Sequence, residues 1–204
     1  MCSLCLEGQE IYCPKGEIQS LQLLNRGSFS TYYLVSYRFV FRLPPGINHL
    51  HAAPLMGAGA TVFSALYNFD VRPTDKIAIV GLGGVGHLAV QFARAWGCEV
   101  TVLSTSTAKR EDAVKLGASR FIITKKETWP ESIKMEFDVL LMVAGIKPDK
   151  WDEYISILKP RGKIILVTAG SDILGIPVCP PKFGDEVDYS ILLSYRKDFG
   201  YLGP

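Results

Sequence analysis

A glycine-rich segment constrains the fold of this chain more than any other feature. The apolar run 77–80 leads into Gly81, Gly83 and Gly86, which are spaced as G-x-G-x-x-G (the glycine loop, residues 81–86). Apolar residues then recur at helical spacing, at Val85, Leu88, Ala89, Phe92, Ala93 and Trp96. A buried strand that enters an amphipathic helix through this turn is the fingerprint of a dinucleotide-binding βαβ unit. The alternative is a chance glycine-rich turn, which the flanking strand and helix disfavour.

Each residue of the glycine loop has a distinct physical role. Gly81 permits a tight turn, Gly83 lets a pyrophosphate approach the backbone, and Gly86 lets the helix pack closely on the strand. Gly84 and Val85 stand where the helix begins, and there the unpaired N–H groups and the positive end of the helix dipole attract phosphates. We therefore predict that these residues bind the phosphates of the cofactor.

The end of the next predicted strand indicates which dinucleotide binds. Strand 99–103 stops where an NAD site would place an acidic side chain for the ribose 2′-OH. The residues that follow are instead hydroxyl-bearing or cationic, namely Ser104, Thr105, Ser106, Lys109 and Arg110. Hydroxyl groups and cations suit a 2′-phosphate, which an acid would repel, so we predict NADP(H). The alternative is a solvated loop whose two cations lie on the exposed first turn of a helix.

Strand and helix patterns alternate regularly along this part of the chain. The predicted strands cover 77–80, 99–103, 120–123, 139–143 and 163–167, and the predicted helices cover 85–96, 108–116, 127–135 and 150–158. Such alternation makes a parallel sheet covered by helices on both faces, which is an α/β fold. Right-handed crossovers give the doubly wound order 3-2-1-4-5, with residues 189–193 as a candidate sixth strand. Ligands of such sheets bind at the carboxyl ends of the strands.

Residues 1–46 follow a different pattern. Short β-rich runs occur at 31–35 and 38–42. They are too few to form a core alone, so we predict that they are part of a β-rich lobe. Residues 47–204 are then assigned to the nucleotide-binding domain, with 50–69 as a helical link.

Composition excludes several other classes of function. The formal charge of +2 over 204 residues is spread along the sequence, so nucleic-acid binding has little support. No segment reaches the roughly 18 apolar residues that a membrane span needs, and the first residues do not begin a signal peptide. We therefore expect a cytoplasmic protein without a membrane partner, in which the five cysteines are thiols or metal ligands rather than disulfides.

Three cysteines and several separated motifs carry a resemblance to a known family. Cys2-x-x-Cys5-x₇-Cys13 is similar to the last three ligands of the four-cysteine structural zinc lobe of zinc-type medium-chain alcohol dehydrogenases. Four segments also resemble the cinnamyl-alcohol-dehydrogenase-like branch of that family: 5–15, 27–30, 52–55 and 81–87. The resemblance extends to about Pro180. It implies a Rossmann-type nucleotide domain beside a partial, GroES-like catalytic lobe.

The resemblance also implies a reaction and a set of sites. The reaction is NADP(H)-dependent hydride transfer between nicotinamide and the carbon of a small alcohol or aldehyde. Cys2, Cys5 and Cys13 would be the remnant of a structural zinc site, and Thr61 would lie beside the nicotinamide. A homodimer is the candidate assembly. The chain would be cut at both ends relative to the family, with the first structural cysteine two residues before Met1.

One departure from the family pattern concerns the catalytic zinc. The family takes a cysteine ligand from the motif Ala-Ala-Pro-Leu-x-Cys-Ala-Gly, whereas residues 52–59 place Gly57 in that position. The remaining ligands of the family belong to an N-terminal segment that this sequence lacks. We therefore assign no catalytic residue and expect impaired activity. The alternative function is a non-catalytic NADP-binding module, such as a pseudoenzyme or a subunit that pairs with an intact homologue.

Overall fold

The structure is a computed structural model that describes residues 2–8, 13–15, 30–37, 40–125 and 129–167. These residues divide into two compact units, one before Ala53 and one from Ala53 onward. The sequence-based boundary between residues 46 and 47 lies slightly earlier, before helix α3 (His49–Pro54). The glycine loop and its neighbours all belong to the second unit.

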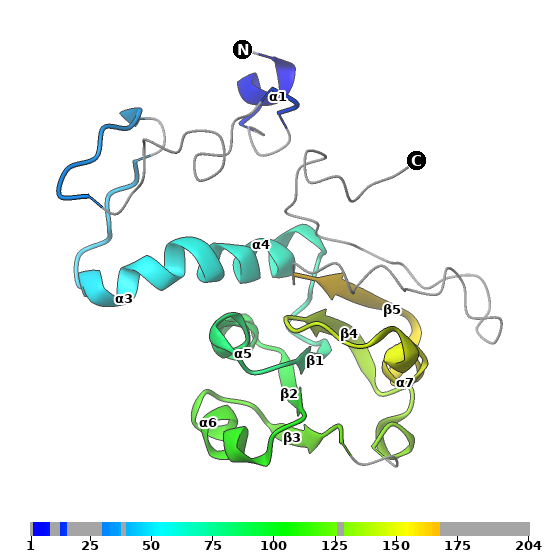
Figure 1. Ribbon diagram of the computed structural model, residues 1–204. Helices are drawn as coiled ribbons and strands as arrows, with labels where there is room; N and C mark the ends of the chain where they lie inside the picture. Colours follow the sequence, from blue (N-terminus) through cyan, green and yellow to red (C-terminus); the bar gives the residue numbers. More distant parts are fainter. Residues whose placement is uncertain (1, 9–12, 16–29, 38–39, 126–128, 168–204) are drawn as a thin grey trace. The chain divides into compact units, whose positions relative to one another are not determined.

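The second unit is built on a five-stranded parallel sheet (Figure 1). Its strands are β1 (Lys76–Val80), β2 (Glu99–Ser104), β3 (Arg120–Ile123), β4 (Phe137–Met142) and β5 (Leu158–Leu166). Their order, β3-β2-β1-β4-β5, confirms the predicted doubly wound order. The candidate strand at 189–193 lies outside the described residues.

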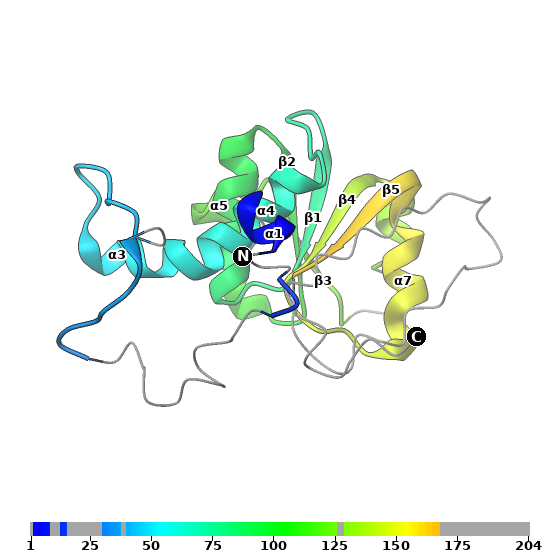
Figure 2. The same cartoon turned by 90° about the horizontal axis from the view of Figure 1, so that it is seen from above.

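Both faces of the sheet are buried, which explains why its strands are apolar without interruption. In β1, Ile77 and Ile79 belong to one core, whereas Ala78 and Val80 belong to the other. The first core is completed by α4 (Ala60–Asn68), α5 (Gly84–Trp96) and α6 (Arg110–Lys115). The second is completed by α7 (Trp151–Ser156) and by residues 129 and 133. Figure 2 shows α4 and α5 on one side of the sheet and α7 on the other.

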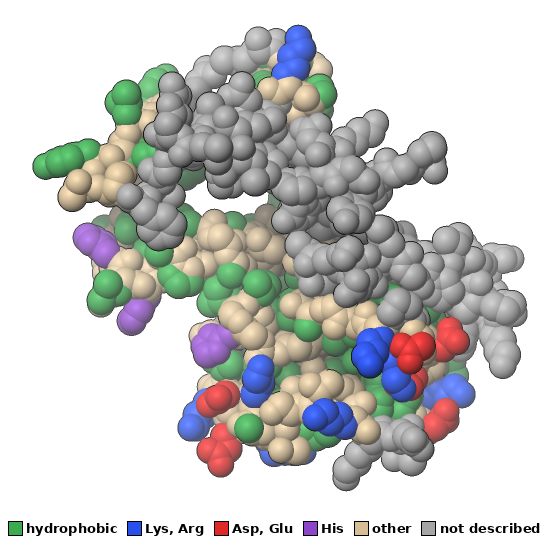
Figure 3. Space-filling view, viewed as in Figure 1, with side chains coloured by type: hydrophobic (Ala, Val, Ile, Leu, Met, Phe, Trp, Pro, Cys, Tyr) green, Lys and Arg blue, Asp and Glu red, His purple; other side chains and the backbone are tan. Residues whose placement is uncertain are grey.

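The predicted link 50–69 is helical but not uniform. After α3, a π-helical turn covers Leu55–Gly59, and α4 continues from it. Residues 43–69 contain no Asp, Glu, Lys or Arg. In Figure 3 the charged side chains accordingly gather over α6 and on the α7 side of the sheet rather than over α4. None of the described helices is long and apolar enough to cross a membrane.

Two sequence-based predictions of local structure are wrong in the described residues. The helix predicted at 127–135 is reduced to a 3₁₀ turn at Glu131–Ile133. Pro130 disfavours a helical conformation at the residue before it and has no N–H to donate, so a regular helix does not pass through this position. Strands are also predicted at 31–35 and 38–42. The described residues of these two runs form no strand. Their side chains are exposed, with Leu34 at 98%.

The connection between α4 and β1 is held by side chains from three other places. The backbone carbonyl groups of residues 69–72 each accept a side-chain hydrogen bond. Nζ of Lys163 in β5 donates to the first two at 2.7 and 3.2 Å. The indole N–H of Trp96 donates to the third at 2.8 Å, and the thiol of Cys98 to the fourth at 3.3 Å. These contacts fix the segment that follows α4 on the sheet and give its backbone carbonyl groups hydrogen-bond partners.

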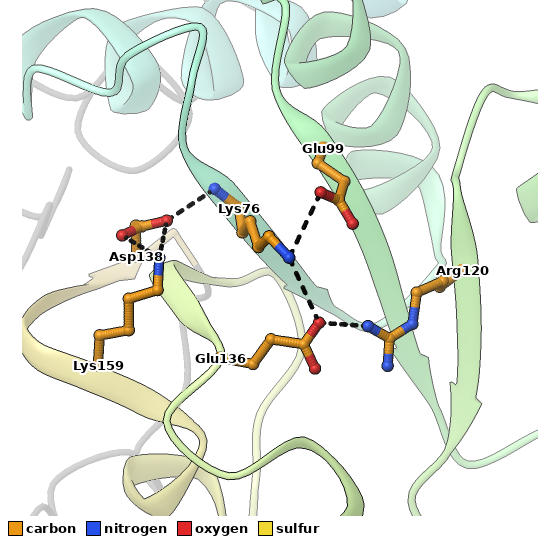
Figure 4. Close-up of polar contacts among 6 residues, drawn as sticks. All are labelled: Lys76, Glu99, Arg120, Glu136, Asp138 and Lys159. Atoms are coloured by element: carbon orange, nitrogen blue, oxygen red, sulfur yellow. Dashed lines mark hydrogen bonds and ion pairs between the residues drawn. The ribbon is translucent and has the colours of Figure 1, made fainter.

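Charged side chains join all five strands at the amino edge of the sheet (Figure 4). This amino-edge network consists of Lys76, Glu99, Arg120, Glu136, Asp138 and Lys159. The Glu136 carboxylate pairs with Arg120 and, at 3.8 Å, with Lys76. Both Asp138 oxygens accept from Nζ of Lys159 at 2.8 Å, and one accepts the Lys76 backbone N–H at 2.9 Å.

The environment of Asp138 determines its charge state. Partial burial raises the pKa of its carboxyl group, but the hydrogen bonds from Lys159 and from the Lys76 backbone outweigh that effect. The net result is a pKa below the usual value, so the carboxylate form is favoured. The network lies at the opposite edge of the sheet from the glycine loop, which follows the carboxyl end of β1.

Candidate functional site

The glycine loop begins in a conformation that requires glycine. Gly81 has a φ of +98°, in the region that side chains rarely adopt. A Cβ there would lie 2.6 Å from the Cβ of Ala144. The Gly81 N–H donates to the Leu103 carbonyl oxygen at 2.9 Å, which joins the turn after β1 to the end of β2. The tight turn predicted from the sequence is therefore present.

The two later glycines differ in what surrounds them. A Cβ at Gly86 would lie 2.3 Å from the Gly81 carbonyl oxygen, so the start of α5 packs directly on the turn. A Cβ at Gly83 would meet no heavy atom within 4 Å. The chain therefore needs Gly86 for its own packing, while nothing in the described structure accounts for the missing side chain at Gly83. A ligand that approaches this backbone would account for it.

The N-terminus of α5 is open where the loop enters it. The His87 N–H makes the first helical hydrogen bond, to the Gly83 carbonyl oxygen at 2.8 Å. The N–H groups of Gly84, Val85 and Gly86 come before that bond and have no acceptor within the helix. Gly83 and Gly84 are exposed. A helix of this length places the positive end of its dipole at these N–H groups, which suits the binding of an anion.

The hydroxyl groups after β2 are not all free to meet a ligand. Ser104 is only 7% exposed. Its Oγ accepts the Ser106 N–H at 3.2 Å, so it shapes the turn at the end of the strand. Thr105 is exposed and Ser106 half-buried. The predicted role of these three residues as phosphate ligands stays a prediction, and Ser104 has a structural task beside it.

The two cations predicted for the 2′-phosphate point to different places. Nζ of Lys109 donates to the carbonyl oxygen of Leu82, inside the glycine loop, at 2.8 Å. The guanidinium carbon of Arg110 lies 5.1 Å from the ring centroid of Phe121, in β3. The structure thus brings Lys109 to the glycine loop and packs Arg110 on an aromatic ring. The contact to Leu82 could not be found from the sequence, because it joins a side chain to a distant backbone atom.

Thr61 and Gly57 lie together at the junction of the π-helical turn and α4. The Thr61 hydroxyl donates to the Gly57 carbonyl oxygen at 3.1 Å. A Cβ at Gly57 would meet no heavy atom within 4 Å, so the described structure leaves room for a side chain there. Gly59 packs closely, with its Cβ position 3.7 Å from Phe92 of α5. The π-helical turn therefore packs against α5, the helix that follows the glycine loop.

The three N-terminal cysteines form a compact cluster in the first unit. Sγ of Cys2 lies 3.6 Å from that of Cys5 and 3.7 Å from that of Cys13. Hydrogen bonds with Cys13 and Cys2 raise the pKa of Cys5 to about 11, whereas hydrogen bonds from Cys5 lower the pKa of Cys2. All three sulfur atoms are within 4.8 Å of one another. They fit three corners of a tetrahedral zinc site, which needs a fourth ligand.

A catalytic zinc site does not fit the residues around Thr61. Among the described residues, the cysteine cluster is the single group of three or more His, Cys, Asp or Glu side chains close enough to hold a metal ion. Gly57 offers no side-chain ligand. The geometry therefore contains a candidate dinucleotide site and a candidate structural metal site, without a donor set for a metal at the reacting end.

Comparisons with known proteins agree with this arrangement. Residues 84–181 match the family model of zinc-binding dehydrogenases. The probable formaldehyde dehydrogenase AdhA of Bacillus subtilis (strain 168) is 39% identical over 174 residues, which are 82% of this chain and 50% of that protein. The chain spans about half the length of the curated relatives that it matches.

Solved structures show the same likeness. The cinnamyl alcohol dehydrogenase SbCAD4 of Sorghum bicolor matches with a TM-score of 0.69 and 32% identity, over 83% of this chain and 50% of that one. The CAD of Helicobacter pylori, solved in complex with NADP(H), matches with a TM-score of 0.70 and 27% identity, over 88% of this chain and 52% of that one. Sequence and structure comparisons thus point to one group of proteins.

Proposed function

Because the chain belongs to the zinc-type medium-chain dehydrogenase family, in its cinnamyl-alcohol-dehydrogenase-like branch, we propose that it binds NADP(H) at the carboxyl ends of β1 and β2. The cofactor would serve an oxidoreductase that moves hydride between nicotinamide and the carbon of a small alcohol or aldehyde. The proposal covers the family's reaction, to which the described residues contribute the nucleotide-binding half.

The observation that carries the proposal is the open backbone at Gly83. Nothing in the described structure occupies the space beside it, and it adjoins the unpaired N–H groups at the start of α5. Two phosphates of a dinucleotide need such a surface, because their oxygens accept hydrogen bonds and carry negative charge. Gly81 and Gly86 meanwhile hold the loop in place by close packing.

The choice of NADP(H) over NAD(H) rests on the end of β2. The strand ends at Ser104 rather than at an acid, and Thr105, Ser106 and Lys109 follow it. A carboxylate there would repel a 2′-phosphate, whereas an ammonium group and hydroxyl groups would bind it. The Helicobacter pylori relative, whose structure holds NADP(H), supports the same choice by likeness.

The residues of this chain have separate tasks in the proposed reaction. The glycine loop would bind the pyrophosphate, and the end of β2 would select the ribose phosphate. Thr61 would lie beside the nicotinamide, as its place in the family motif implies. When bound, the nicotinamide supplies or accepts the hydride, and the protein's contribution is orientation and exclusion of water. The described residues offer no donor set for a catalytic zinc, so we derive no step that uses one.

Gly57 favours a second candidate function. A metal that polarises the substrate oxygen contributes several kcal/mol to such a reaction. If no other residue replaces the ligand missing at Gly57, the chain would bind NADP(H) without appreciable turnover. It would then be a non-catalytic module or the partner of an intact homologue.

Fluorescence titration and a turnover assay of the 204-residue chain test the proposal. We expect saturable binding of NADPH that is tighter than that of NADH, and loss of binding in Gly83→Val. Equal affinity for the two cofactors would contradict the NADP(H) assignment, and no binding of either would contradict the site. Oxidation of NADPH with an aromatic aldehyde would support the oxidoreductase, whereas binding without turnover would support the non-catalytic module.

A further inference from the structure

Lys109 makes a contact that its predicted phosphate role does not explain. Its ammonium group donates to the Leu82 carbonyl oxygen at 2.8 Å, although the two residues are 27 positions apart. Lys109 belongs to a 3₁₀ turn, Thr107–Lys109, that follows β2, whereas Leu82 follows β1. One side chain therefore joins the two loops that make up the proposed cofactor site.

This contact holds the glycine loop directly before its two least restrained residues, Gly83 and Gly84. Among the described residues, Lys109 provides the one side-chain hydrogen bond to the glycine loop. Gly83 and Gly84 are exposed, and a Cβ at either position would meet no neighbouring atom within 4 Å. Glycine has more backbone freedom to lose than any other residue. A bond at Leu82, directly before these two glycines, reduces the freedom that cofactor binding would otherwise have to remove.

The contact also changes the charge that an anion would meet. The Leu82 carbonyl oxygen carries a partial negative charge within a loop that is proposed to receive a pyrophosphate. A cation hydrogen-bonded to that oxygen offsets its negative charge. The positive potential of the adjacent N–H groups then dominates the space that an anion would enter. An ammonium group has three donors, so it can hold the carbonyl oxygen and still offer a hydrogen bond to a ligand.

We propose that Lys109 is a positioning residue that holds the glycine loop through the Leu82 carbonyl oxygen, and that it thereby raises the affinity for NADH as well as for NADPH. The inference rests on the proposed function and deepens it. A lysine that only bound the 2′-phosphate would leave the affinity for NADH unchanged, because NADH lacks that phosphate.

Matched variants separate the two roles. Lys109→Met keeps most of the aliphatic stem and removes the ammonium group, while Lys109→Arg keeps a cationic donor. Lys115→Met, in α6, removes the same charge from an exposed lysine for which no contact with the glycine loop is found among the described residues.

Titration of each variant with NADH and NADPH gives the affinities. We expect Lys109→Met to weaken NADH binding about fivefold, which is the effect of one ordinary hydrogen bond, and NADPH binding by more. Lys109→Arg should retain most of the NADH affinity, and Lys115→Met should match the wild type.

Hydrogen–deuterium exchange of the cofactor-free protein tests the loop directly. The amides of Gly81 and His87, whose hydrogen bonds hold the two ends of the glycine loop, should exchange faster in Lys109→Met than in the wild type, and at the wild-type rate in Lys115→Met. An unchanged NADH affinity in Lys109→Met would overturn the inference, and so would an unchanged exchange rate in the glycine loop. If the wild type bound neither dinucleotide, the proposed function itself would fail, and the exchange rates would still show whether Lys109 holds the loop.

Discussion

At the scale of single residues, the three glycines of the G-x-G-x-x-G motif are not equivalent. Gly81 and Gly86 satisfy the chain's own geometry, since a Cβ at either would overlap atoms that cannot easily move. Gly83 satisfies no internal requirement: its φ is −101°, which is extended backbone, and the space beside it is open. Under the proposed function, the motif therefore combines residues needed for folding with a residue needed for binding.

Substitution at Gly83 and Gly86 should separate these two requirements. Gly83→Val should leave the unfolding midpoint almost unchanged and abolish dinucleotide binding, because the side chain would fill the space that the pyrophosphate needs. Gly86→Ala should destabilise the fold by about 1–3 kcal/mol, because its Cβ would press on the Gly81 carbonyl oxygen. Denaturant unfolding and cofactor titration measure both effects. Normal cofactor binding by Gly83→Val would show that the motif has been misinterpreted.

At the scale of elements, the end of α4 is held by Lys163, which lies in the edge strand β5. Lys163 of β5 donates to two carbonyl groups at that end, where a positive charge is also favourable to the helix dipole. Lys163→Met should lower the free energy of unfolding by about 1 kcal/mol without changing the denaturant m-value. Lys115→Met is the control for the loss of a surface charge. Equal stability of the two variants would mean that the Lys163 contacts at residues 69 and 70 contribute nothing measurable.

The amino-edge network gives stability a defined dependence on pH. The pKa of Asp138 is lowered in the folded chain, so its contribution is complete above the unfolded value of about 3.9. It is then lost as the pH falls through the lower, folded value. Asp138→Asn should cost on the order of 1 kcal/mol near neutral pH, an amount reduced by partial exposure of the pair, and progressively less in acid. Unfolding curves of both proteins across the acid range measure the difference. A constant difference at every pH would contradict the role of the carboxylate.

The strands could be predicted from the sequence more fully than the helices. The predicted strand 120–123 coincides with β3, since short apolar runs bounded by turns are typical of buried parallel strands. The structure extends β5 back to Leu158, beyond the predicted start at 163, because Leu158 pairs with Phe137 of β4 across an irregularity in the register. The π-helical turn at Leu55–Gly59 has no periodicity of its own and could not be predicted.

The candidate site could be predicted only as far as local sequence determines it. Spacing alone indicates the glycine loop, since its geometry arises within six residues. The Lys109 contact with Leu82 depends on two adjacent strands that bring their loops together, and the Arg110 contact with Phe121 depends on the packing of α6 on β3. Such partners become visible only when the strand order is known.

At the scale of the whole molecule, the chain carries two candidate sites of different completeness. The second unit, which contains the proposed cofactor site, has a closed core on both faces of its sheet. The cysteine cluster of the other unit offers three sulfur atoms, one fewer than tetrahedral zinc requires. The chain also spans about half the length of its curated relatives, so the activities of those whole proteins are not inferred for it.

Metal content distinguishes a partial zinc site from a complete one. We expect the purified 204-residue chain to hold substoichiometric zinc after mild chelation, because three thiolates bind the ion less firmly than four. Cys13→Ser should remove what remains, while Cys98→Ser, at a buried thiol outside the cluster, should not. Elemental analysis gives the ratio directly. Stoichiometric zinc that survives chelation would show that another ligand completes the site.

The placement of the charged network and the glycine loop at opposite edges of one sheet has a consequence for how this chain can change. Strands of five or six residues separate the two edges by roughly 17–20 Å, a distance at which substitutions without shared partners usually have additive effects. A loop residue at the carboxyl edge can therefore be replaced at some loss of stability, and a stabilising substitution at the amino edge can restore that loss without altering the proposed cofactor site. The sheet thus separates the loop residues at which substitutions could change ligand specificity from the amino-edge residues whose substitutions change stability alone.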